Sequence, residues 1–257
     1  MKIEVLGCDG GPGPGARLSC YLVDERLLID CGCVVSSLPR ERLDRIECVI
    51  ITHCHFDHIL ELPFLPMMRD VERAGPLAIV AAPPAIDRIR RFIFNPEIWF
   101  DLSPQGRGAS FAGRIEYRPV PAGETFECGG VQCELVPVAH EGDTHGVIAV
   151  ASGSGFAFTS DTGPTDEIWW RLRDHPKVRD VLADCSYPND MEEMAIATGH
   201  LTPRLLAAEA TKLPTFAPCC IHAVHIKPEW RAQTLADIAA IAEPQITAVT
   251  SGDVLTI

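Results

Sequence analysis

The sequence Thr-His-Cys-His-Phe-Asp-His occupies residues 52–58, directly after the apolar run Cys-Val-Ile-Ile at residues 48–51. Imidazole and carboxylate groups gain little from burial in an apolar core, so packing does not explain three histidines and an aspartate in so short a stretch. Both groups are common ligands of divalent metal ions. The stretch therefore predicts a metal centre at the end of a buried strand.

The spacing within residues 52–58 divides the four side chains into two groups. If the strand continues, alternate side chains share a face, which places His53, His55 and Asp57 in one series and His58 on another side. His53 and His55 would bind one ion, and Asp57 and His58 a second. This mixed nitrogen and oxygen set favours zinc, with manganese and iron as alternatives. A surface histidine cluster, or a helix start with a capping aspartate, is the competing interpretation without a metal.

The composition suits one folded enzyme domain over residues 1–257, because 47% hydrophobic residues can bury a substantial core. The formal net charge is −13, and no dense run of Lys or Arg occurs. Long nucleic acid is therefore an unfavourable partner. A small anionic substrate remains compatible, since bound cations reverse the local field.

The sequence also carries expectations about location and redox state. It begins Met-Lys-Ile-Glu-Val-Leu-Gly, which is typical of a strand and not of a cleaved leader, and no apolar run has membrane-spanning length. We therefore expect a cytoplasmic protein without a membrane partner. The sequence leaves the oligomeric state open, with a homodimer as one alternative. The eleven cysteines include Cys31 with Cys33 and the adjacent Cys219 and Cys220, and no CxxC pair occurs. This odd, irregular set predicts mostly reduced core residues.

The apolar pattern predicts two sheets with flanking helices. Strands and helices alternate up to residue 94, including a strand at 77–81, and short strands with turn signals fill residues 114–159. A strand at 178–184, a helix at 229–242 and a last strand at 249–257 follow. The glycine-rich stretch at 7–15 lacks the ending of a phosphate-binding loop and is interpreted as a turn.

Further candidate ligands and substrate contacts lie at or near the ends of later predicted strands, where open α/β folds usually have their active sites. His140, Asp161 and His225 each end such a strand and can add ligands to a metal pair. His200 lies just before a helix that Thr202 caps, where backbone amides favour an anion. His145 follows His140 in a turn and is kept as a candidate substrate contact.

Two residues near the candidate ligands are assigned structural roles. His222 lies three positions before His225 on a predicted strand, so we expect it on the opposite face. Cys54, between His53 and His55, is expected to face away from the metals as a small buried apolar residue. Carboxylates that orient the ligand imidazoles are also expected, but the sequence does not identify them.

Six motifs make the chain resemble a known family. His-x-His-x-Asp-His at residues 53–58 is the signature of the metallo-β-lactamase superfamily of binuclear metallohydrolases. The other five look like successive motifs of class II 3′,5′-cyclic nucleotide phosphodiesterases: NPEIWFD at 95–101, TSDTGP at 159–164, CSYPN at 185–189, GHLTP at 199–203 and HIKP at 225–228. The resemblance covers nearly the whole chain, in order and without a large gap.

The resemblance implies a four-layer αββα sandwich with two divalent metal ions in the cleft between its sheets. It assigns seven metal ligands: His53, His55 and His140 to the first ion, Asp57, His58 and His225 to the second, and Asp161 to both. Asp57 and His200 are the implied catalytic residues, with His200 beside the scissile phosphate and His145 as the further substrate contact. The implied reaction is hydrolysis of cAMP or cGMP to a 5′-nucleotide by a metal-bridging hydroxide.

The chain departs from that family at two positions and leaves other activities open. Phe56 stands where these phosphodiesterases usually carry leucine, and Ser160 replaces the usual glycine before Asp161. The expected partner is a small phosphodiester. A tRNase Z-like or generic phosphodiester hydrolase, a lactone or thioester metallohydrolase, an iron redox enzyme and a non-catalytic metal-binding scaffold are the alternatives. The first of these would be expected to carry a basic substrate arm, which this acidic chain lacks.

Overall fold

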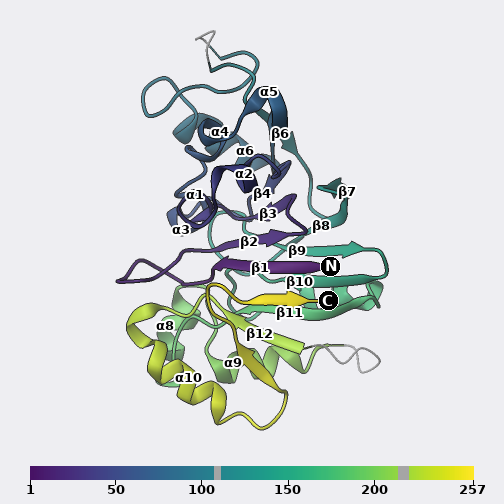
Figure 1. The fold of residues 1–257 in the computed structure, drawn as a ribbon. Coiled ribbons are helices and arrows are strands. Elements are labelled where there is room, and N and C mark those ends of the chain that lie inside the picture. The colour runs from purple at the N-terminus through teal and green to yellow at the C-terminus, as the bar shows by residue number, and fades with distance from the viewer. Residues whose placement is uncertain (107–110, 214–219) are drawn as a thin grey trace.

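Two seven-stranded mixed sheets form the centre of the computed structural model, which describes residues 1–106, 111–213 and 220–257 (Figure 1). The first sheet runs in the order β14 (Val254–Thr256), β1 (Lys2–Gly7), β2 (Cys20–Val23), β3 (Leu27–Ile29), β4 (Cys48–Ile50), β5 (Leu77–Ala81) and β6 (Ile115–Pro119). The second runs β13 (Ile246–Ala248), β12 (Cys220–Val224), β11 (Val178–Asp184), β10 (Ser154–Phe158), β9 (His145–Ala151), β8 (Val131–Pro137) and β7 (Thr125–Cys128).

The two sheets have the same mixed pairing. Strands β14 to β3 and strands β7 to β10 pair antiparallel with their neighbours. The steps from β3 to β6 and from β10 to β13 are parallel. Parallel strands need crossover connections, and these supply the helices that cover the outer faces. The pattern gives each half of the molecule one sheet and one helical layer.

Short helices cover the outer face of each sheet (Figure 1). Those of the first half are α1 (Val34–Ser37), α2 (Arg40–Leu43), α3 (Phe56–Ile59), α4 (Leu65–Met68), α5 (Val71–Ala74), α6 (Pro83–Arg88) and the π-helix η1 (Ile89–Ile93). Those of the second half are α7 (Glu167–Arg171), η2 (Leu172–Asp174), η3 (Asn189–Met191), α8 (Glu192–Ala197), α9 (Pro203–Ala210), η4 (Pro228–Trp230) and α10 (Arg231–Ala239). None of the helices in the described ranges has the length and hydropathy needed to cross a bilayer.

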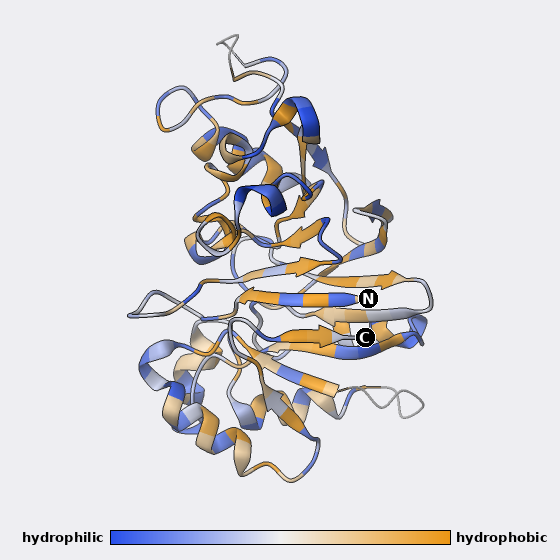
Figure 2. Ribbon diagram, viewed as in Figure 1, coloured by the Kyte–Doolittle hydropathy of each residue, from blue (hydrophilic) through white to orange (hydrophobic). Residues whose placement is uncertain are grey.

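Three apolar clusters hold these four layers together. In β4, Cys48 and Ile50 point into the cluster between the sheets, whereas Val49 points into the cluster beneath the first helical layer. In β10, Phe156 joins the inter-sheet cluster and Ala157 joins the cluster beneath the second helical layer. Because such strands are covered on both faces, they are hydrophobic throughout, and they are the orange arrows of the interior in Figure 2.

The expected αββα sandwich is confirmed, with local corrections. The strands predicted at 77–81 and 178–184 coincide with β5 and β11. The last strand predicted at 249–257 is wrong, since β13 ends at Ala248 in the second sheet and β14 begins at Val254 in the first. The intervening turn contains Gly252 in the left-handed region (φ 101°), whose N–H donates to the Val5 carbonyl. The predicted strand therefore contains only β14, and its first residues form the connection from β13.

The cysteines are mostly reduced, as expected, with one exception. A disulfide joins Cys48 of β4 to Cys128 of β7 and so links the two sheets across the inter-sheet core. Eight other cysteines in the described ranges are free, most of them buried, and Cys219 lies outside those ranges. The pairing depends on the meeting of two strands 80 residues apart, which cysteine spacing alone does not reveal.

Candidate metal centre

The loop after β4 presents the four polar side chains of residues 52–58 in a different way from the predicted alternation. The strand ends at Ile50, His53 lies in the following loop, and His55 is the N-cap residue of α3. Asp57 and His58 belong to the first turn of that helix. The expected split into two groups therefore arises because the chain turns from loop to helix after His55, not because a strand continues.

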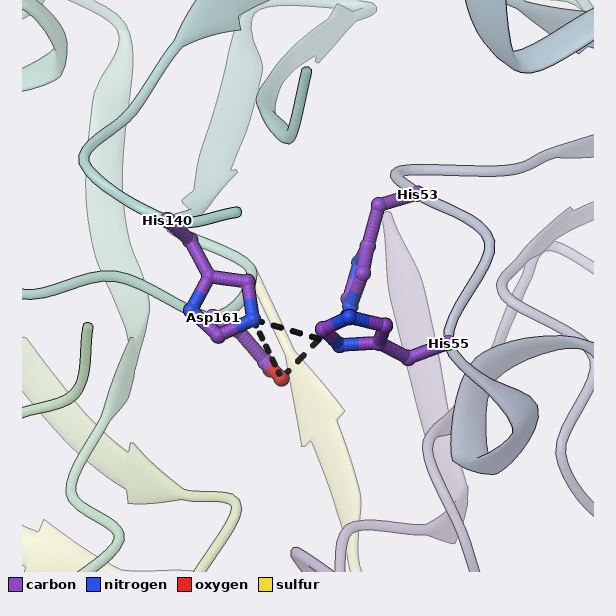
Figure 3. A group of neighbouring side chains, drawn as sticks. All are labelled: His53, His55, His140 and Asp161. Atoms are coloured by element: carbon purple, nitrogen blue, oxygen red, sulfur yellow. Dashed lines mark hydrogen bonds and ion pairs between the residues drawn. The ribbon is translucent and has the colours of Figure 1, made fainter. Parts of the chain in front are cut away.

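The first ligand cluster contains four residues whose ligating atoms lie within 4.8 Å of one another: His53, His55, His140 and Asp161. In Figure 3 their side chains converge from the segments that follow β4, β8 and β10. His140 Nε2 lies 3.3 Å from His55 Nδ1. Asp161 Oδ2 lies 3.7 Å from His53 Nε2 and 3.9 Å from His140 Nε2.

The second cluster contains Asp57, His58, Asp161 and His225, within the same limit of 4.8 Å. Asp161 Oδ1 lies 3.2 Å from His58 Nε2 and 3.3 Å from His225 Nε2. Asp57 Oδ2 lies 3.3 Å from His225 Nε2 and 3.9 Å from His58 Nε2. The two oxygens of Asp161 thus face different clusters, which is the geometry of a carboxylate that can contact two cations.

The donor set and one unpaired atom fit a divalent metal. His53 Nε2 is fully buried and has no hydrogen-bond partner among the described groups, although it points toward Asp161. An unpaired buried polar atom is unfavourable, and a cation between the two side chains would satisfy it. Nitrogen and oxygen ligands in this mixture suit zinc and other divalent transition metals.

The pKa values of His53 and Asp161 favour their ligating forms. Burial, aided by the neighbouring His58, lowers the pKa of His53 well below its ordinary value, so the ring is neutral. Burial alone would raise the pKa of Asp161, but His225 and His58 hold it well below the ordinary value. A neutral imidazole and an ionised carboxylate are the forms that bind metal. Burial would lower the pKa of His58, but Asp161 and Asp30 raise it well above its ordinary value, so a bound cation would have to displace a proton from His58.

The backbone conformation at residue 160 explains why the family usually has glycine where this chain has Ser160. It has φ 56°, in the left-handed region that glycine adopts without steric cost. The usual glycine before Asp161 therefore matches the backbone, and serine is tolerated with some strain. Ser160 Oγ is also buried without a hydrogen-bond partner among the described residues. The backbone directly before Asp161 is therefore conformationally demanding.

Hydrogen bonds from neighbouring residues fix the orientation of the ligand imidazoles. Asp30, fully buried at the end of β3, accepts hydrogen bonds from His58 Nδ1 (2.7 Å) and from the N–H and Oγ of Thr52 (both 3.0 Å). The Gly199 carbonyl accepts from His140 Nδ1 (2.8 Å), and Ser186 Oγ lies 3.0 Å from His225 Nδ1. Such contacts set the tautomer and aim the opposite ring nitrogen at a metal.

His200 lies beside both clusters. Its Nδ1 donates to Asp184 Oδ2 (2.7 Å), and its ring centroid lies 4.9 Å from that of His140 and 5.3 Å from that of His225. The predicted cap is present, since Thr202 Oγ accepts from the Leu205 N–H at the start of α9. Asp184, His200 and His225 also form a third group of possible ligands. The short hydrogen bond already gives Asp184 a partner there.

Three other predicted residues lie outside the clusters. His222 donates to Asp180 of the neighbouring strand β11 (2.8 Å), which agrees with a structural role. Cys54 Sγ points toward the Ala85 carbonyl, away from the ligands. His145 begins β9 with a buried side chain, and its backbone N–H donates to the Thr52 carbonyl (3.2 Å). Its role as a substrate contact stays a prediction.

Sequence reasoning missed Asp30 and Asp184. Each is a buried aspartate at the end of an apolar strand, the same signal that pointed to Asp161. That signal could have marked both as parts of the site, because a buried carboxylate requires a partner. It could not have shown that one holds His58 and the other His200, since these pairs are 28 and 16 residues apart.

Two mixed sheets between helical layers, with histidine and aspartate clusters at the strand ends, define a hydrolase of the metallo-β-lactamase fold. A family model described as "Beta-lactamase superfamily domain" matches residues 25–240, and the chain belongs to this superfamily. A Yersinia pestis protein named "Probable 3′,5′-cyclic-nucleotide phosphodiesterase" is 25% identical over 259 aligned residues, which cover 84% of this chain and 73% of the relative.

Solved structures share the fold at lower identity. Unliganded yeast PDE1 superimposes with a TM-score of 0.82 at 18% identity, covering 100% of this chain and 99% of that one. Human tRNase Z, short form, superimposes with a TM-score of 0.71 at 17% identity, with the same coverage of 100% and 99%. At such identities these likenesses establish the architecture and leave the substrate to the site itself.

Substitution of Asp30 tests whether its hydrogen bond with His58 supports metal binding. We expect Asp30→Asn to lower metal affinity about 10- to 100-fold, because the charge that orients His58 is lost. Metal retained against increasing chelator measures the effect. Asp180→Asn is the matched control, since Asp180 holds His222 in a similar bond outside the clusters. Wild-type affinity in Asp30→Asn, or the same loss in both variants, would contradict the assignment.

Proposed function

We propose that this chain hydrolyses a small phosphodiester, with 3′,5′-cyclic nucleotides as substrates and 5′-nucleotides as products. The observation that carries the proposal is the position of His200. It lies beside His140 and His225 but outside the two clusters that share Asp161, and Asp184 fixes its ring. A histidine held in this way is suited to act on a molecule bound at the centre rather than to complete either cluster.

The hydrogen bond to Asp184 also sets the chemistry of His200. Burial would lower the pKa of His200, but the Asp184 carboxylate raises it above the ordinary value. With Nδ1 occupied by Asp184, Nε2 is the nitrogen left to contact a substrate. His200 would hold a proton there and donate it to the departing 3′ oxygen, or donate a hydrogen bond to a phosphate oxygen.

The proposed centre uses two divalent cations, with zinc favoured and manganese or iron as alternatives. When bound, they supply a nucleophile from water near neutral pH and offset the charge of the phosphate. The first would be held by His53, His55 and His140, and the second by Asp57, His58 and His225, with Asp161 contacting both. Asp57 would help to hold the second cation, and its 3.3 Å contact with His225 supports this role.

The comparisons support a phosphodiester over a carboxylic ester. The relative from Yersinia pestis carries the name of a cyclic-nucleotide phosphodiesterase and aligns with most of this chain. An RNA-processing activity is the second candidate, because the human tRNase Z structure shares the fold. The formal net charge of −13 argues against it, since a long RNA backbone requires basic surface. A lactone or thioester offers no phosphate oxygen for the aspartate-held His200 to contact.

Metal analysis and turnover on a small substrate panel test this proposal. We expect about two divalent ions per chain, loss of activity with chelator, and hydrolysis of cyclic AMP or cyclic GMP to the 5′-nucleotide. Bis(p-nitrophenyl) phosphate serves as a generic diester, and a lactone and a tRNA precursor represent the other candidates. Activity on the generic diester alone would remove the cyclic-nucleotide assignment, and activity on the lactone alone would remove phosphodiester hydrolysis.

Substitution of His200 tests its role as a proton donor. We expect His200→Ala to lower kcat on a cyclic nucleotide about 10²- to 10⁴-fold, the usual contribution of a general acid. The loss on bis(p-nitrophenyl) phosphate should be much smaller, because p-nitrophenolate leaves without a proton. His222→Ala is the control, since it also removes a largely buried histidine bound to an aspartate. Equal losses on both substrates would rule out proton donation.

A further inference from the structure

Lys227 is a cation at the edge of the centre that has no acidic partner. Its Nζ donates to the Gly10 carbonyl (3.0 Å) and lies 5.2 Å from the centroid of the Tyr187 ring. Within the described ranges it forms no ion pair, whereas Lys212 pairs with Asp166 and Glu209. In a chain of net charge −13, a half-buried ammonium group with only a carbonyl and an aromatic face is unusual.

The surroundings of Lys227 place this charge next to the proposed catalytic histidine. The Tyr187 ring lies 5.8 Å from the ring of His200 and 5.3 Å from that of Trp230. Lys227 follows the candidate ligand His225 by two residues, and its N–H donates to the Ser186 carbonyl (3.2 Å).

The glycine-rich stretch at residues 7–15 holds the lysine in place. A Cβ atom at Gly10 would collide with the carbonyl oxygen of His225, so only glycine lets the two backbones approach this closely. The Gly10 N–H donates to the Ile226 carbonyl (3.2 Å), while its own carbonyl accepts from Lys227. This stretch, interpreted as a turn from sequence, therefore packs against the backbone that carries His225 and Lys227.

We propose that Lys227 is an anion-binding residue that receives a non-bridging phosphate oxygen of the substrate, with Tyr187 as the wall behind it. This inference rests on the proposed phosphodiesterase function. A partly buried ammonium group without a carboxylate partner can accept a counter-ion, and a bound phosphate would supply one. Because the charge is present in both the ground state and the transition state, Lys227 contributes mainly to substrate affinity.

Three variants isolate the charge of Lys227. Lys227→Gln keeps an N–H donor for the Gly10 carbonyl but removes the charge, and Lys227→Arg keeps the charge. Lys177→Met removes one charge from an exposed site as a control. On metal-loaded protein we measure affinity for inorganic phosphate by calorimetry, and KM and kcat on the preferred diester. Circular dichroism and metal content verify that each variant is folded and loaded.

We expect Lys227→Gln to weaken phosphate binding about tenfold and to raise KM by a similar factor, with kcat changed less than about threefold. Lys227→Arg should recover most of the affinity, and Lys177→Met should match the wild type. Wild-type phosphate affinity in Lys227→Gln would overturn the proposal, as would a fall in kcat without a change in KM or affinity. If the wild type hydrolyses no phosphodiester, the proposed function fails, while the phosphate titration still decides the role of Lys227.

Discussion

The buried carboxylate of Asp161 is the constraint on which the rest of the site depends. One of its oxygens faces His53 and His140, and the other faces His58 and His225. His53 and His58 follow a strand of the first sheet, whereas Asp161 ends a strand of the second, so the contacts join the two halves of the sandwich. A buried charge costs several kcal/mol unless it is paired. The centre therefore requires both sheets to be in place.

The two halves support the centre in the same way. Asp30 at the end of β3 and Asp184 at the end of β11 are fully buried, and each accepts a 2.7 Å hydrogen bond from an imidazole Nδ1. One of these aspartates orients His58, a candidate ligand, and the other orients His200, the proposed proton donor. In the proposed mechanism, an aspartate that orients an imidazole would serve metal binding on one sheet and substrate chemistry on the other.

The sequence predicts the fold class and the candidate ligands because both depend on local patterns. Alternating apolar runs give the strands, and polar residues directly after them mark Asp161 and His225. What it cannot predict depends on contacts between distant segments. Nothing in the sequence shows which of 35 acidic residues packs against His58, or that the stretch at 7–15 holds Lys227. The strand assumed through residues 52–58 was also wrong, since the chain enters α3 after His55.

Anomalous X-ray diffraction from crystals of the metal-loaded protein, collected at the absorption edge of the bound metal, tests the central claim most directly. The account predicts two peaks, one on each side of the Asp161 carboxylate. The first should lie among His53, His55 and His140, and the second among Asp57, His58 and His225. A single peak, or a peak among Asp184, His200 and His225, would contradict a centre in which Asp161 joins two cations.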